Sequence, residues 1–282
     1  MSSTPGRVLL RRALIVGVAL GALFSASAAN AASTLPKLNV AISAASATIP
    51  ANVESGGTNV AITDTGVKEA SVILFLLKPG ATIAEVESFA ASKKASSDPN
   101  NTVKLGSIVF DAEANPGQPN EAQGNLQPGN YVLLVGVGEK PPVVRGHFAV
   151  TPAKAPQPLP KAAATIRSIE FGFKGPSTLH DGELVAFENE GFLVHMNFAL
   201  PVKNMGAARA LVKDLRAGNE RAGFKLVAGQ PVAFAGPMSH EAMMEETITA
   251  KPGIYVEVCF MDTQDHRVHT QLGMERIIRI TK

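Results

Sequence analysis

The sequence predicts an all-β fold made of two tandem Greek-key β-sandwiches, each with one short inserted helix. Short β-branched or alternating apolar runs are separated by Pro-Gly and Asp-Gly turns, a pattern typical of antiparallel sheets packed face to face. The second half of the chain also repeats the order of elements found in the first half. We therefore expect one fold that has been duplicated.

The first 31 residues have the pattern of a secretory signal. Arg7, Arg11 and Arg12 precede an apolar run over residues 13–24, and a small-residue stretch ends at Ala31. The apolar run is shorter than the roughly 20 residues that a membrane-spanning helix needs. We expect an exported, periplasmic or extracellular protein without a stable membrane anchor. The paired arginines leave a twin-arginine export route open.

The charge balance makes nucleic acid an improbable partner. The chain has 26 Lys and Arg residues, and removing the three arginines of the signal leaves 23 against 24 Asp and Glu residues. Phosphate binding needs a concentrated basic surface, which this balance does not favour.

The repeat divides the mature chain into domains at 32–150 and 165–282, joined by a linker at 151–164 that is rich in proline. Equivalent positions lie 123 to 127 residues apart. The capping box Thr82-Ile-Ala-Glu85 opens the first predicted helix. The predicted pairs of elements are the strands Ser71–Leu77 and His195–Leu200, the helices Thr82–Ala91 and Ala207–Leu215, the strands Tyr131–Val135 and Tyr255–Cys259, and the closing strands Gly146–Val150 and Gly273–Ile280.

Cys259 is the only cysteine, so the chain can form no internal disulfide. It is either a buried apolar side chain or a thiolate held by a metal. His195, His269 and Met274 complete a set of one thiolate, two imidazoles and one thioether. This ligand set makes a trigonal copper site with a weak axial sulfur. The chain has no His-x-His pair, which argues against a multicopper oxidase cluster.

The segment Gly182–His195 resembles the cupredoxin segment in which a strand and a Gly-Phe loop deliver the first histidine ligand, closest to the plastocyanin-like branch. Tyr255–Cys259 resembles the strand that ends in the ligand cysteine, and His269–Met274 resembles the loop with the second histidine and the axial methionine. The resemblance covers Ile166–Lys282. It implies one copper ion in the second domain, a role in electron transfer or copper handling without enzyme activity, and a redox protein or a copper donor or acceptor as partner.

Two features qualify the resemblance. Nine residues, Phe260–Val268, separate the cysteine from the second histidine, where the family has only a few, and His266 could replace His269 as the ligand. In the first half, Val72, Val135 and His147 occupy the positions that correspond to His195, Cys259 and Met274. We therefore expect the first domain to bind no copper.

Other interpretations stay open. The chain is alternatively a metal-free β-sandwich module for interaction or adhesion that kept the shape and lost the metal. Met274 is alternatively a core residue, and the soft side chains of Met238–Met244 are alternatively Cu(I) ligands of a copper carrier. Hydrolysis is the weakest possibility, because the chain lacks a Gly-x-Ser-x-Gly elbow, a His-Glu-x-x-His helix and a phosphate loop.

Overall fold

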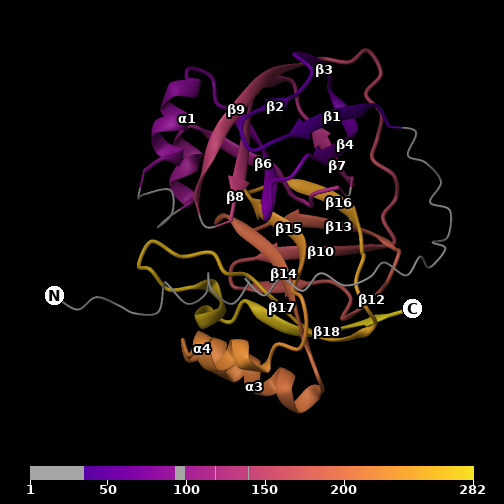
Figure 1. Cartoon of the computed structure of the whole chain (residues 1–282), viewed down its shortest axis with the longest axis vertical. Coiled ribbons are helices and arrows are strands. Elements are labelled where there is room, and N and C mark those ends of the chain that lie inside the picture. Colours follow the sequence, from indigo (N-terminus) through magenta and orange to yellow (C-terminus); the bar gives the residue numbers. More distant parts are fainter. Residues whose placement is uncertain (1–34, 93–98, 118, 139) are drawn as a thin grey trace.

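The computed structural model describes residues 35–92, 99–117, 119–138 and 140–282 (Figure 1). The predicted signal at 1–31 lies outside the described residues. Within the described part, no helix combines the length and the apolar character needed to cross a membrane.

The first half forms two packed sheets. Its outer sheet has the order β3-β9-β8-β5-β6, and β2-β1-β4-β7 faces it. The strands are β1 (Lys37–Ile42), β2 (Ala47–Thr48), β3 (Asn52–Glu54), β4 (Gly56–Asp64), β5 (Ala70–Leu77), β6 (Gly106–Ala114), β7 (Asn120–Leu126), β8 (Gly129–Val137) and β9 (Lys140–Thr151).

The second half has the same arrangement. Its outer sheet has the order β12-β18-β17-β14-β15, and β11-β10-β13-β16 faces it. The strands are β10 (Ala164–Ile169), β11 (Gly172–Lys174), β12 (Thr178–His180), β13 (Leu184–Asn189), β14 (His195–Val202), β15 (Val232–Met238), β16 (Met243–Thr247), β17 (Gly253–Val258) and β18 (Glu275–Thr281). The chain is all-β with two sandwiches, as predicted.

The two halves share a sheet. β7 pairs with β16, with Gly124 opposite Met244, and this pairing joins the two facing sheets into one sheet of eight strands (Figure 1). No sequence pattern predicts this union, because strand pairing between distant segments leaves no local signal. A large buried core of apolar side chains includes residues from both halves, such as Phe110 and Phe187.

The sheets are mixed and not purely antiparallel, so the expected strand arrangement is corrected here. β1 with β4, β3 with β9, β10 with β13 and β12 with β18 are parallel pairs. A parallel pair needs a crossover connection. In the first half, the chain crosses to the outer sheet through β3 between β1 and β4, which supplies that crossover.

Corresponding tyrosines make the same contact in both halves. The hydroxyl of Tyr131 donates to the carbonyl of Gln127 at 2.9 Å, and that of Tyr255 donates to the carbonyl of Lys251 at 2.7 Å. Strand order and this contact agree between the halves, whereas the duplication itself and the domain boundaries stay predictions.

Each half carries a helix at the predicted place. The first, α1 (Ile83–Ala90), begins at Thr82 with the expected capping box. The second, α3 (Met205–Arg216), begins at Asn204, whose side chain accepts from the backbone of Ala207. The second half adds a short helix, α4 (Glu220–Gly223), and the 3-10 turns are η1 (Pro99–Lys104), η2 (Phe224–Leu226) and η3 (His269–Leu272).

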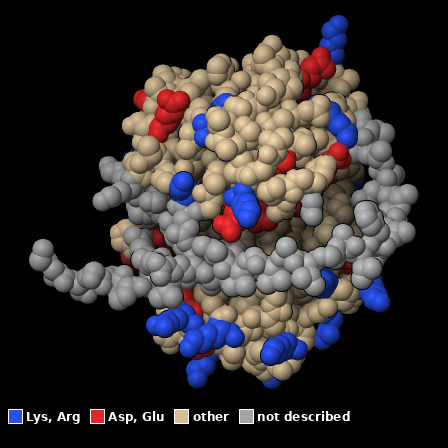
Figure 2. All heavy atoms as spheres, in the orientation of Figure 1, with Lys and Arg blue, Asp and Glu red and all other residues tan. Residues whose placement is uncertain are grey.

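Positive charge gathers at one end of the molecule. Figure 2 shows Lys and Arg side chains over the end that α3 and α4 form. α3 and α4 contain four basic residues, Arg209, Lys213, Arg216 and Arg221, and two acidic ones, Asp214 and Glu220. This end is basic although the whole chain has a formal charge of only +2.

Candidate metal centre

Three chain segments deliver the predicted imidazole and thiol ligands. His195 is the first residue of β14, Cys259 directly follows β17, and His269 begins η3. β14 and β17 are antiparallel neighbours, with Phe198 opposite Val258, so the start of β14 meets the end of β17. The three side chains are buried.

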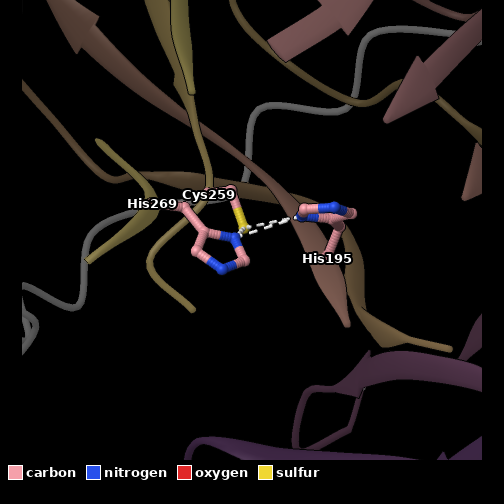
Figure 3. Close-up of side chains that lie close together, drawn as sticks. All are labelled: His195, Cys259 and His269. Atoms are coloured by element: carbon pink, nitrogen blue, oxygen red, sulfur yellow. Dashed lines mark hydrogen bonds between the residues drawn. The ribbon is translucent and has the colours of Figure 1, made fainter. Parts of the chain in front are cut away.

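The ligand atoms point toward one another (Figure 3). Cys259 Sγ lies 3.3 Å from Nδ1 of His269 and 3.8 Å from Nδ1 of His195. The two Nδ1 atoms are 3.1 Å apart. In the described part of the chain, these three residues form the one group of His, Cys, Asp or Glu side chains close enough to share a metal ion.

The separations fit a trigonal ion. An ion bonded at roughly 2.0 Å to each nitrogen and roughly 2.3 Å to sulfur would hold the nitrogens roughly 3.5 Å apart and each nitrogen roughly 3.7 Å from sulfur. The observed distances of 3.1, 3.3 and 3.8 Å lie within about 0.4 Å of these values. Only a small movement of the side chains would therefore admit an ion.

Burial controls the protonation of the three ligands. It raises the pKa of the Cys259 thiol to about 12 and lowers the pKa of His195 to about 4. Burial, together with the neighbouring His195, lowers the pKa of His269 to about 3. Without metal at neutral pH the thiol is protonated and both imidazoles are neutral. A bound cation would displace the thiol proton, because the thiolate is the ligand.

The long loop between the cysteine and the second histidine folds into a small hairpin. Asp262 bridges to Val268, and the backbone of Thr263 donates to the carbonyl of Arg267 at 2.9 Å. The backbone of His269 then donates to the carbonyl of Met261 at 2.8 Å. The additional residues project as a hairpin, and His269 still returns to a place beside Cys259.

His266, the alternative ligand, is exposed on this hairpin and does not belong to the group. Its φ of 66° places it at the turn. The structure therefore brings His269, and not His266, beside Cys259.

Met274 is bound through its backbone to both ligand segments. Its N–H donates to the carbonyl of His269 at 3.0 Å, and its carbonyl accepts from the N–H of Cys259 at 3.2 Å. Gly273, with φ of 103°, makes the left-handed turn that places Met274 there. The side chain of Met274 is fully buried. Its use as the axial ligand stays a prediction.

The remaining candidate positions lie in the core or on the surface. Met238 and Met244 lie in the hydrophobic core. Val72 and Val135, which the predicted repeat aligns with two ligands, face each other across β5 and β8 and belong to the same core. His147 is exposed in β9.

A buried polar network lies one step along the strands from the ligands. Asn197, Glu257 and Arg276 each stand two residues from His195, Cys259 and Met274 respectively. Asn197 donates to Glu257 at 3.0 Å, and Arg276 donates to Glu257 at 2.6 Å. Residues two apart on a strand share a face, so the network forms the layer next to the ligands.

Contacts that the sequence analysis missed surround the site. Asn100, in the first half, accepts from the backbone of Val194 at 2.6 Å. Glu170 Oε1 lies 3.9 Å from Nε2 of His195, and the ring of Phe171 meets that of His269 edge-on at 5.3 Å. No sequence signal marks these residues, because each comes from a segment distant from its partner.

Comparison with known proteins gives structural likeness only. No protein-family model matches the chain, and no curated protein matches its sequence. The auracyanin of Roseiflexus castenholzii is 20% identical, covering 43% of this chain and 100% of its own, with a TM-score of 0.27. Auracyanin B is 16% identical, covering 44% and 93%, with a TM-score of 0.27. A Cu-containing nitrite reductase from Thermus scotoductus is 16% identical, covering 88% and 68%, with a TM-score of 0.25. Because these likenesses are weak, the description of the fold rests on the strand order, and the functional argument rests on the geometry of the site.

Proposed function

We propose that this protein binds one copper ion in a cupredoxin-like second sandwich and serves in electron transfer or copper handling outside the cytoplasm. The observation that carries the proposal is the buried group of His195, Cys259 and His269, with both Nδ1 atoms turned toward the sulfur. Two imidazoles and a thiolate suit copper. Met274 would supply the weak axial sulfur.

The residues present have separate roles in this proposal. The thiolate and the two imidazoles would hold the ion, and copper would supply a one-electron couple. The buried surroundings exclude water from the three ligands. Pairing between β14 and β17 holds the segments of His195 and Cys259 together, and a site whose geometry changes little between two oxidation states would favour electron transfer. Export rests on the sequence of residues 1–31, and the partner would be a redox protein or a copper donor or acceptor.

A metal-free module would not need these distances. Side chains that only filled a core would have no reason to turn the Nδ1 atoms of two imidazoles and a thiol to one point. Three buried donor atoms at one point are the arrangement that a shared metal ion requires.

The test is titration of the purified protein with Cu(II), followed by visible absorption. We expect one equivalent to produce intense absorption from thiolate-to-copper charge transfer. Cys259→Ser should abolish the band, and His266→Gln, on the exposed hairpin, should leave it unchanged. Absence of the band in the wild-type protein, with equal copper binding by Cys259→Ser, would contradict the proposal.

A further inference from the structure

A two-residue turn contacts both histidines of the site. Glu170 and Phe171 connect β10 to β11, since Ile169 pairs with Gly172 across the hairpin. Glu170 Oε1 lies 3.9 Å from Nε2 of His195, and the Phe171 ring meets the His269 ring at 79° with centroids 5.3 Å apart. One turn thus contacts both imidazoles, and its carboxylate faces the nitrogen of His195 that is not turned toward the sulfur.

The turn is held in an unfavourable conformation. Phe171 has a φ of 59°, a left-handed backbone that bulky residues rarely adopt. Such a conformation persists only where the surrounding structure imposes it, and it is concentrated at functional sites.

Gly191 keeps the space between the carboxylate and the histidine open. A Cβ at this position would lie 2.7 Å from Glu170 Oε1 and 2.7 Å from His195 Nε2. Glu170 also accepts from the backbone of Phe192 and, at 3.3 Å, from that of Leu193. The carboxylate is therefore anchored to the loop that leads directly into His195.

The chemistry of imidazole makes this carboxylate relevant to metal binding. A neutral imidazole that binds a metal through Nδ1 carries its proton on Nε2, and that N–H needs an acceptor. Nε2 of His195 is buried and has no hydrogen-bond partner among the described residues. The Glu170 carboxylate faces it and, with a side chain 38% exposed, has room to approach by the roughly 1 Å that a hydrogen bond requires.

The half without ligands lacks such a turn. β1–β2 holds the place of β10–β11 in the sheet order, and its turn is Ser43-Ala44-Ala45-Ser46. Ser43 and Ser46 bond to each other across that turn. A carboxylate and an aromatic ring occur only in the turn beside the His-Cys-His group.

We propose that Glu170 is a positioning residue for the metal centre, which accepts the Nε2–H of His195 when Nδ1 binds copper, while Phe171 fixes the ring of His269. This inference rests on the proposed copper function. The anionic carboxylate would strengthen the ligand and stabilise Cu(II) relative to Cu(I). Its loss should therefore weaken Cu(II) binding and raise the reduction potential.

The experiment compares Glu170→Gln with the matched control Glu190→Gln. The glutamine keeps an acceptor oxygen for the Phe192 and Leu193 amides but loses the charge. Glu190 adjoins Gly191, and its carboxylate lies 3.0 Å from Arg167. We expect Glu170→Gln to weaken Cu(II) binding about 10- to 100-fold and to raise the reduction potential, and Glu190→Gln to change the affinity by about twofold at most.

A second variant separates loss of the charge from a general disturbance of the turn. Glu170→Asp keeps the charge on a shorter side chain, and its Cu(II) affinity should fall between those of the wild type and Glu170→Gln. Equal affinity and potential in Glu170→Gln and Glu190→Gln would overturn the role of Glu170 and leave the copper proposal standing. A wild-type protein that binds no copper would overturn both.

Discussion

Burial of His195 and His269 favours the neutral form of both imidazoles in the metal-free protein. Burial lowers their pKa values to about 4 and about 3, so both rings are neutral near pH 7. A neutral imidazole is the form that binds a metal, so no proton has to leave it. Because the pKa values of the histidines differ between the folded and the unfolded chain, the stability of the metal-free protein depends on pH.

In the metal-free protein, the contribution of the two histidines to stability should fall as pH falls from about 6.5 toward 4, opposite in sign to the contribution of buried acids such as Asp111. Over this range the histidines gain protons in the unfolded chain but not in the folded one, so the free energy of unfolding decreases, by on the order of 3 kcal/mol for each ring. Urea unfolding at pH 7 and pH 5 measures the effect, and His269→Gln should show a smaller decrease than the wild type. His180→Gln, at an exposed histidine, is the control. Equal decreases in wild type and His269→Gln would contradict the account.

Among the secondary-structure elements, β14, β17 and β18 each adjoin a predicted ligand, and each also contributes one residue to the polar network beside the ligands. Asn197 on β14, Glu257 on β17 and Arg276 on β18 bond to one another between the strands. Glu257 is fully buried, and the side chain of Arg276 is 18% exposed. The network therefore fixes the relative positions of the strands that bring the ligands to one end of the sandwich.

Arg276→Met should be strongly destabilising. It leaves the buried Glu257 without its cationic partner, and breaking a buried pair in this way costs about 3–5 kcal/mol. Arg279→Met, at an exposed position of the same strand, should change the free energy of unfolding by about 0.5 kcal/mol or less. Chemical denaturation of both variants measures the difference. A small effect of Arg276→Met would show that the network does not hold the strands.

The elements also show where sequence patterns suffice. The strand at His195–Leu200 was predictable from apolar runs, and the structure extends it to Val202. The predicted helix Ala207–Leu215 begins earlier, at Met205, because Asn204 provides the cap. The compact hairpin at 262–268 was not predictable, since its bridge depends on local geometry that no residue pattern specifies.

At the scale of the whole molecule, the first sandwich is bound to the second by strand pairing and by buried polar contacts. Ser239, directly after β15, and Ile108 on β6 exchange hydrogen bonds, each at 2.9 Å. Asp111 on β6 is buried against Gly236 on β15, where any side chain would collide with its carboxyl group. Burial raises the pKa of Asp111 to about 8.

The contact between the two sandwiches at Asp111 should become less stable as pH rises. Asp111 holds its proton in the folded protein up to pH about 8 but loses it near pH 4 when unfolded, so its contribution to stability decreases across that interval. Asp111→Asn should remove this decrease and become more stable than the wild type by roughly 1 kcal/mol or more at pH 8. Glu87→Gln, at an exposed site on α1, is the control. Thermal unfolding from pH 5 to pH 8 checks the prediction, and parallel curves for wild type and Asp111→Asn would contradict it.

The sequence predicted the ligand order but not what surrounds the ligands. His195, Cys259 and His269 were recognisable because a lone thiol follows one imidazole and precedes the other in the ligand order that the family resemblance implies. Glu170 and Asn100 were not, since their roles come from contacts with residues 25 and 94 positions away, and such contacts leave no trace in local composition. The shared eight-stranded sheet escaped prediction for the same reason.

The most direct test of the account is copper X-ray absorption of the purified protein loaded with one equivalent of Cu(II). The account predicts one short copper–sulfur bond from Cys259 and two imidazole nitrogens, with the sulfur bond lost in Cys259→Ser. A copper ion surrounded only by nitrogen and oxygen in the wild-type protein would contradict it.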